Sequence, residues 1–142
     1  MKYIIHWFFV HFLWHAGKKT TLARSIYNKL NQSDNVAYLI HDDYYKNLSD
    51  KTFEERARQN FDHPDSLDTE ILIQHVRDLK AGKIIQVPKY DFSTHLRVEG
   101  ETTTVQPKPI ILVEGILIFS NPDLVNELDI KVFVDADSDV RK

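Results

Sequence analysis

The segment Leu13 to Leu22 (LWHAGKKTTL) ends in residue types that bind phosphate groups. In a phosphate-binding loop, two glycines let backbone N–H groups surround the phosphates, a lysine neutralises charge, and a Ser or Thr hydroxyl reaches Mg²⁺. Lys19 and Thr20 match the last two positions of that pattern, whereas Lys18 and Leu13 stand where its glycines belong. The loop therefore has an intact end and an altered front half, and alone it is a weak indication of ATP binding.

A second alignment of this loop uses Gly17 and Lys18 as the Gly-Lys pair. Phe12 then replaces the first glycine and Lys19 replaces the hydroxyl residue. We prefer the Lys19-Thr20 alignment because it keeps the following helix in phase. The segment lies between an apolar run and a predicted helix, which is where such a loop belongs.

Carboxylates follow three apolar runs of strand length. Asp42 and Asp43 follow the run over residues 36–40, Glu114 follows residues 110–113, and Asp135 follows residues 130–134. Parallel strands bring their carboxyl ends to one edge of a sheet, where ligands bind in open α/β folds. We therefore expect these acids to gather at one edge. The alternative is that acidic residues end strands without any shared role.

The elements that must position these residues alternate between strands and helices. Strands are expected at 3–10, 36–40, 84–89, 110–113 and 130–134, and helices at 20–30, 52–59, 68–80 and 123–128. The 68–80 helix has Ile71, Leu72, Val76 and Leu79 as its apolar stripe, Ser66 or Asp68 as its cap, and Gly82 after its end. Residues 90–98 are expected to be a loop. This alternation predicts a parallel sheet with helices on both faces.

Composition limits the classes of function. The chain has 142 residues, the size of one domain, with a net charge of -3 and no cysteine. No basic excess favours nucleic acid or an anionic membrane, and Cys-based zinc sites and disulfides are excluded. The apolar stretch Tyr3 to Trp14 is too short for a membrane span, and we interpret it as a buried first strand followed by altered sequence.

Four further segments occur in order along the chain: HDDYYK from His41, NFDHPD from Asn60, PKYDFSTHLR from Pro88 and VEGIL from Val113. From about Thr20 to Arg141, the chain resembles the uridine kinase (uridine-cytidine kinase) family. NFDHPD and YDFSTH are the segments most specific to that family, and they favour it over the related phosphoribulokinases and pantothenate kinases.

The resemblance implies roles for individual residues. Asp42 matches the general base that accepts the proton of the ribose 5′-hydroxyl, with Asp43 as its local competitor. Glu114 matches the strand-end acid near Mg²⁺ and the phosphates, so that Thr20, Glu114 and Asp42 are the expected metal ligands. The remaining positions fall into two sets. The nucleotide set is Gly17, Lys18, Lys19, Thr20 and Thr21, with Lys19 also catalytic; the nucleoside set is Tyr45, Phe61, Asp62, Tyr90, Phe92, His95 and Arg97.

At the level of the whole chain, the resemblance implies a single α/β domain over residues 1–142, built on a P-loop nucleoside-kinase-like sheet. The expected activity uses ATP or GTP with Mg²⁺ to phosphorylate uridine or cytidine in the cytoplasm, in pyrimidine salvage. A homo-oligomer is expected, with no nucleic-acid or membrane partner. Relative to the family, the glycine-rich loop is altered, and the Arg-rich lid and the last strands are missing, so impaired activity is expected. The alternatives are a catalytically degenerate nucleoside-binding or regulatory protein, and a related P-loop kinase.

Overall fold

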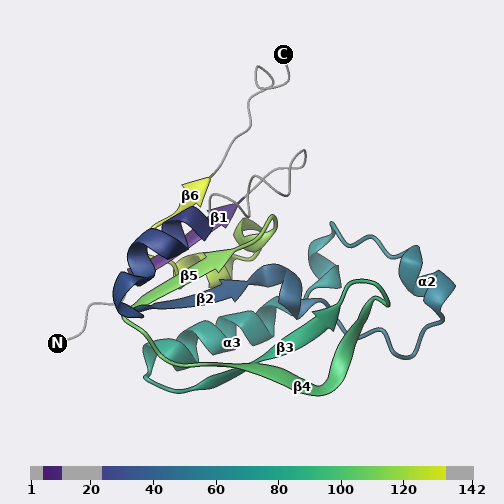
Figure 1. The fold of residues 1–142 in the computed structure, drawn as a ribbon. Helices are drawn as coiled ribbons and strands as arrows, with labels where there is room; N and C mark the ends of the chain where they lie inside the picture. The colour runs from purple at the N-terminus through teal and green to yellow at the C-terminus, as the bar shows by residue number, and fades with distance from the viewer. Residues whose placement is uncertain (1–4, 11–23, 134–142) are drawn as a thin grey trace.

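A computed structural model describes residues 5–10 and 24–133 of the chain. Its centre is a four-stranded parallel sheet in the order β2-β5-β1-β6 (Figure 1). The strands are β1 (Ile5–Val10), β2 (Val36–Ile40), β5 (Ile110–Glu114) and β6 (Val132–Phe133). All four strands lie where the sequence predicts them.

Helices cover both faces of the sheet. On one face, α3 (Thr69–Lys80) packs its buried side chains against β2 and β5, notably Leu39, Ile111 and Val113. On the other face, a helix described over residues 24–30 packs Ile26 and Leu30 near Leu112. Alternate residues of β5 therefore serve two separate cores, as expected for a strand buried on both sides. The predicted α/β class with helices on both faces is confirmed.

The details of α3 correct two expectations. Its buried stripe contains Ile73, whereas Ile71 is 37% exposed, so Ile73 takes the place of Ile71 and the rest of the predicted stripe is confirmed. Asp68 occupies the cap position but its side chain makes no cap hydrogen bond, because the carboxylate accepts from Arg97 instead. The hydroxyl of Ser66 does not cap α3 either, since it donates to the carbonyls of Phe61 and His63.

The C-terminal end of α3 agrees with the prediction. Gly82 has a φ of +82° and its N–H bonds the Leu79 carbonyl, while the N–H of Lys83 bonds the Asp78 carbonyl. This pair of bonds is the Schellman arrangement, in which a left-handed glycine satisfies the last helical carbonyls. The chain then turns directly into the strand β3 (Ile85–Asp91).

A β-hairpin takes the place of the loop expected at residues 90–98. β3 (Ile85–Asp91) pairs antiparallel with β4 (Leu96–Val105), and the register shifts between Pro88 and Tyr90. β4 escaped prediction because its residues are mostly exposed and polar, so it has no alternating apolar signal. Figure 1 shows this hairpin running beside α3 and the sheet, with its turn close to α2 (Phe53–Ala57).

Short elements complete the description. A 3₁₀ turn over His41–Tyr44 follows β2 directly, and α2 begins at a capping box formed by Thr52 and Glu55. The others are the 3₁₀ turns Asn31–Ser33, Pro64–Ser66 and Ile118–Ser120 and the helix α4 (Pro122–Asn126), which Asn121 caps. Both predicted short helices, at 52–59 and 123–128, are thus present but shorter, and α4 begins one residue earlier than predicted.

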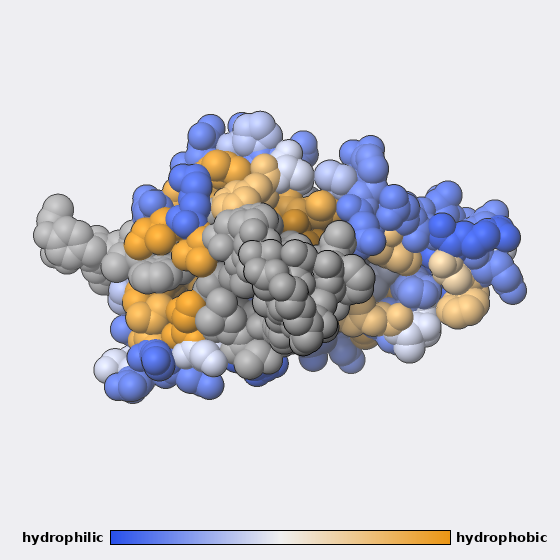
Figure 2. Space-filling model, turned by 90° about the horizontal axis from the view of Figure 1, so that it is seen from above, coloured by the Kyte–Doolittle hydropathy of each residue, from blue (hydrophilic) through white to orange (hydrophobic). Residues whose placement is uncertain are grey.

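The surface differs between the two ends of the molecule. Seen from above, hydrophilic residues dominate the end that carries α2, and apolar residues gather over the sheet (Figure 2). In the described part of the chain, no helix combines the length and the apolar character that crossing a membrane requires.

Candidate active site

The carboxyl edge of the sheet brings acidic residues together. Glu114 ends β5, and its register partners in the neighbouring strands are Ile40 of β2 and Phe9 of β1. Asp42 and Asp43 follow β2 at the same level, in the 3₁₀ turn. The expected cluster therefore exists for these three acids. Asp135, the fourth acid of that expectation, lies outside the described residues.

Glu114 is held in a defined position although it is almost completely buried, at 2% exposure. Its carboxylate accepts a hydrogen bond from the hydroxyl of Tyr38, whose ring stacks on Tyr27 with centroids 5.3 Å apart. Burial, followed by this hydrogen bond, raises the pKa of Tyr38, so the hydroxyl keeps its proton and donates it. Sequence reasoning missed Tyr38, since an aromatic residue inside a strand has no local pattern that marks a polar contact.

Asp42 and Asp43 occupy different surroundings. Burial raises the pKa of Asp43 to about 6, and the charges of Asp42 and Glu114 add to the effect. Asp42 instead lines a cavity of about 330 Å³ beside the sheet edge. A carboxylate that faces a cavity can accept a proton from a bound molecule.

This cavity is largely aromatic, and its lining comes from three stretches of sequence. The side chains around it are Asp42, Tyr45, Phe61, Tyr90, Phe92 and His95. Six of the residues predicted for one site are thus brought together in space. A concave apolar site with a few polar groups is the usual form of a small-molecule site.

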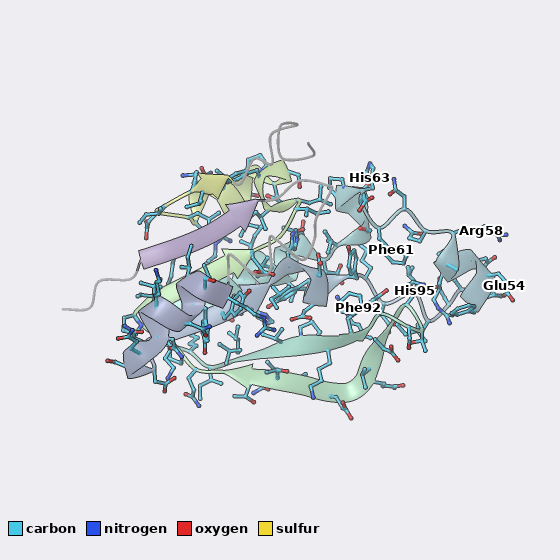
Figure 3. All side chains as sticks on the ribbon, turned by 45° about the horizontal axis from the view of Figure 1, so that its top comes forward. Glu54, Arg58, Phe61, His63, Phe92 and His95 are labelled. Atoms are coloured by element: carbon cyan, nitrogen blue, oxygen red, sulfur yellow. The ribbon has the colours of Figure 1, made fainter. Side chains whose placement is uncertain are left out.

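Tyr45 is the centre of the aromatic contacts. Its ring centroid lies 5.2 Å from that of Phe61 and 5.3 Å from that of Tyr90, with Phe92 at 6.4 Å. These distances and their tilted or edge-on angles are those of attractive aromatic pairs. Figure 3 shows Phe61 and Phe92 converging on the same region from opposite sides, one from the loop before Pro64–Ser66 and one from the hairpin turn.

His95 stands at the hairpin turn with an unusual backbone. Its φ is +57°, in the left-handed region that non-glycine residues rarely adopt. The imidazole stacks on Phe61, with centroids 5.0 Å apart and planes 21° from parallel (Figure 3). The strained backbone thus aims the ring at the cavity, which is a common feature of binding sites.

The hydroxyl of Tyr90 is buried and has no hydrogen-bond partner among the described residues. The residue is only 8% exposed and lines the aromatic cavity. Burial raises the pKa of Tyr90, so this oxygen carries its proton. A buried, unpaired hydroxyl costs about 1 to 3 kcal/mol, and a ligand with a polar edge would remove that cost.

Arg97 ties the segments of the site together. Its Nε donates to the carbonyl of Tyr45 at 3.0 Å, and its Nη2 donates to the Asp68 carboxylate at 2.6 Å. Two backbone bonds reinforce the connection, from the Lys46 N–H to the Ser66 carbonyl and from the Asp68 N–H to the Tyr44 carbonyl. Arg97 is not among the cavity-lining residues, so its expected contact with substrate stays a prediction.

Asp62 is exposed and does not line the cavity. Its charge is close enough to act on Tyr45, whose pKa rises mainly through burial and then through Asp42 and Asp62. His63 has a structural position, since its Nδ1 accepts from the Asp65 N–H at the start of a 3₁₀ turn.

The predicted nucleotide-binding residues Gly17, Lys18, Lys19, Thr20 and Thr21 lie outside the described residues. β1 ends at Val10, and its Phe9 is paired with Glu114, so the chain leaves the sheet beside that acid. Among the described residues, no three His, Cys, Asp or Glu side chains form a group that could hold a metal ion by themselves.

Comparisons with known proteins give a consistent result. The model of the Phosphoribulokinase / Uridine kinase family matches residues 15–142. The chain is 46% identical over 126 residues to a uridine kinase of Chloroflexus aurantiacus and 47% identical over 123 residues to one of Clostridium botulinum. It covers 59% of the length of each of these relatives.

Solved structures share the fold. A structure described as a "Possible Uridine Kinase" from Bacillus stearothermophilus aligns with a TM-score of 0.64 at 20% identity, covering 99% of this chain and 73% of that one. A D-glycerate 3-kinase from Cryptococcus neoformans aligns with a TM-score of 0.55 at 18% identity, covering 80% of this chain and 43% of that one. At these identities the similarity is one of architecture.

Proposed function

Because the chain belongs to the Phosphoribulokinase / Uridine kinase family, we propose that its aromatic cavity binds a pyrimidine nucleoside. The observation that supports this most directly is the buried hydroxyl of Tyr90, which has no hydrogen-bond partner among the described residues. A flat heterocycle would stack on the rings of the cavity while its polar edge accepts from Tyr90. His95 offers a second polar edge at the same wall.

The proposed reaction is transfer of the γ-phosphoryl group of ATP or GTP to the 5′-hydroxyl of uridine or cytidine. Asp42 accepts the hydroxyl proton as the oxygen attacks phosphorus, and the bond to the leaving nucleoside diphosphate breaks. Asp62 binds the ribose hydroxyls, and Arg97 braces Tyr45 beneath the base. Lys19 neutralises the charge of the phosphates.

The acids at the sheet edge suit Mg²⁺, which binds oxygen ligands. In phosphoryl-transfer enzymes this ion is generally held by one or two carboxylates together with phosphates and water. Glu114 and Asp42, with the hydroxyl of Thr20, are the proposed ligands. When bound, Mg²⁺ supplies positive charge that offsets the charge on the transferred group. We place the enzyme in the cytoplasm, in pyrimidine salvage, as a homo-oligomer.

A second candidate function is nucleoside binding without catalysis. The observation that favours it is the altered loop, where Leu13 and Lys18 replace the glycines that a phosphate-binding loop uses. Titration calorimetry separates the two functions. Uridine and Mg-ATP both bind in the first, and uridine alone binds in the second.

Turnover is tested by a phosphoryl-transfer assay with uridine and Mg-ATP, with pantothenate and ribulose phosphate as competing acceptors. Asp42→Asn should abolish turnover while leaving uridine affinity within about threefold, and Asp43→Asn is the matched control. Binding of neither uridine nor cytidine would overturn the proposal. Preference for another acceptor would move the chain to a different kinase of the family.

A further inference from the structure

The exposed helix α2 lies against the turn that carries His95. None of its five residues is buried, so α2 adds little to the core. Phe53, at its start, is nevertheless a large apolar side chain that is 50% exposed. Its ring lies 6.1 Å from that of His95, with planes 32° apart. Since Phe61 stacks on His95 at 5.0 Å, the imidazole contacts two phenyl rings.

Arg56 of α2 connects this helix to the turn. Its Nε donates to the carbonyl of Thr94 at 3.0 Å, and its Nη1 donates to the carbonyl of Lys51 at 2.5 Å. The guanidinium also lies over the ring of Phe53, at 5.7 Å from the centroid. A planar guanidinium with several fixed donors can hold two carbonyls and a ring at once, which a lysine cannot do.

The position of the Thr94 carbonyl matters for His95. That carbonyl belongs to the peptide group that precedes His95, and rotation of this group about the N–Cα bond of His95 defines φ. The value of +57° is strained for histidine and persists only where the surroundings hold it. Within the turn, the His95 N–H bonds the Asp91 carbonyl, and the N–H and hydroxyl of Ser93 both donate to the Asp91 carboxylate. Arg56 adds a restraint on the same peptide group, at its carbonyl oxygen.

α2 is itself fixed at its start. The Thr52 hydroxyl accepts from the Glu55 N–H at 3.2 Å, and the Glu55 carboxylate accepts from the Thr52 N–H at 3.0 Å. This capping box gives a helix of five residues a defined beginning. Arg56 is the residue after Glu55, so the backbone from which its side chain extends is held by the capping box.

We propose that Arg56 is a positioning residue for base recognition, which holds the His95 imidazole against Phe61 by fixing the Thr94 carbonyl while Phe53 covers the outer face of the ring. The inference rests on the proposed function for the identity of the ligand, a nucleoside. The contacts between Arg56 and the turn that carries His95 do not depend on that function. Arg56 acts through His95 and has no contact with the nucleoside in this scheme.

The first test needs no ligand. Ring currents of Phe61 and Phe53 shift the imidazole protons of His95, whose NMR signals are identified by their absence in His95→Gln. Arg56→Ala and Phe53→Leu should move these signals toward the values of an exposed histidine. Arg58→Ala is the matched control, because Arg58 directly follows α2 and points away from the turn (Figure 3). Unmoved signals in Arg56→Ala would overturn the proposal.

The second test uses uridine binding. Arg56→Ala should weaken the affinity about tenfold, and Arg58→Ala should leave it within about twofold. In a His95→Ala background, Arg56→Ala should have no further effect, since a residue that acts through another loses its effect with it. Additive losses would overturn the positioning role.

A failure of the proposed function and a failure of the positioning role of Arg56 give different results. If the wild-type chain binds neither uridine nor cytidine, the proposed function fails, and the imidazole signals alone decide whether Arg56 positions His95. If uridine binds and the signals do not respond to Arg56→Ala, the positioning role fails and the proposed function stands. Should Arg56→Ala not fold, Phe53→Leu gives the same comparison from the other contact of His95.

Discussion

The guanidinium of Arg97 and the carboxylate of Asp68 form an ion pair, 2.6 Å from Nη2 to Oδ2, that joins the β3–β4 hairpin to the start of α3. The two side chains are 21% and 29% exposed, so water screens the pair only partly. Arg97 also donates to the Tyr45 carbonyl. One side chain thus connects three segments that are far apart in the sequence.

Replacing Arg97 should therefore loosen the site and the fold together. Arg97→Ala should lower the free energy of unfolding by about 2 kcal/mol, since charged hydrogen bonds to two partners are lost. Arg97→Lys keeps the charge but cannot reach both partners in one plane, so an intermediate loss is expected. Urea unfolding at neutral pH measures both variants. Equal stability of wild type and Arg97→Ala would show that the ion pair contributes nothing.

Removing the hydroxyl of Tyr90 should separate stability from binding. Tyr90→Phe deletes a buried group without a partner among the described residues, so the protein should gain up to about 1 kcal/mol of stability. The same change should weaken uridine binding about tenfold, because the base loses a donor. Thermal unfolding and calorimetry on one preparation give both quantities. A loss of stability in Tyr90→Phe would mean that the hydroxyl already has a partner.

His75 should make stability depend on pH. Its Nδ1 lies 2.8 Å from the hydroxyl of the buried Tyr44. Burial lowers the pKa of His75 below its usual 6.5, with the charge of Asp78 opposing the shift. The unfolded chain then binds more protons between the two pKa values, so this stability is full above about pH 6.5 and is lost as the pH falls through the folded value.

The measurement is the urea midpoint of wild type and His75→Gln from about pH 7.5 to about pH 5. Wild type should lose more stability over that interval than the variant. Every other histidine is present in both proteins, so the difference isolates His75. If the urea midpoints of wild type and His75→Gln changed equally with pH, His75 would not be the source of the pH dependence.

Gly115 should tolerate no side chain. A Cβ there would lie 2.5 Å from the Cβ of His41 and 3.0 Å from Ile118 Cγ2, so β5 and the turn after β2 would have to separate. Gly115→Ala should cost about 3 kcal/mol and displace the neighbouring acids. Gly82→Ala is the comparison, because its Cβ meets open space and only the backbone at φ +82° is strained. Gly82→Ala should lower the free energy of unfolding by about 1 kcal/mol. The urea midpoints of the two variants show which of them is less stable.

Sequence reasoning worked best where burial sets the pattern. The strand over 36–40, the strand before Glu114 and the end of α3 at Gly82 all follow from apolar runs or from glycine. The hairpin strand β4 was missed, since an exposed strand rich in Thr and Glu has no apolar period. Its pairing with β3 depends on residues elsewhere in the chain.

In the candidate site, too, residues in distinctive segments could be predicted, and contacts made across the fold could not. The six cavity-lining residues were recognisable because their segments are distinctive in sequence. Asp68 and Tyr38 were not recognised as partners of Arg97 and Glu114, because each contact is made across the fold. Asp68 even has the residue type of a helix cap, and a stronger charged partner takes its carboxylate away from that role.

All six cavity-lining side chains come from the stretch between β2 and β5, two strands that are neighbours in the sheet. The chain leaves the sheet after Ile40 and returns at Ile110, which is paired with Val36 at the other end of β2, so the intervening residues form a crossover between two parallel strands. This crossover includes α3, whose buried side chains pack against both strands. The aromatic cavity and one of the two cores are thus built by the same segment, so a change of cavity made by exchanging that segment between related scaffolds would have to preserve the packing of α3 on the sheet.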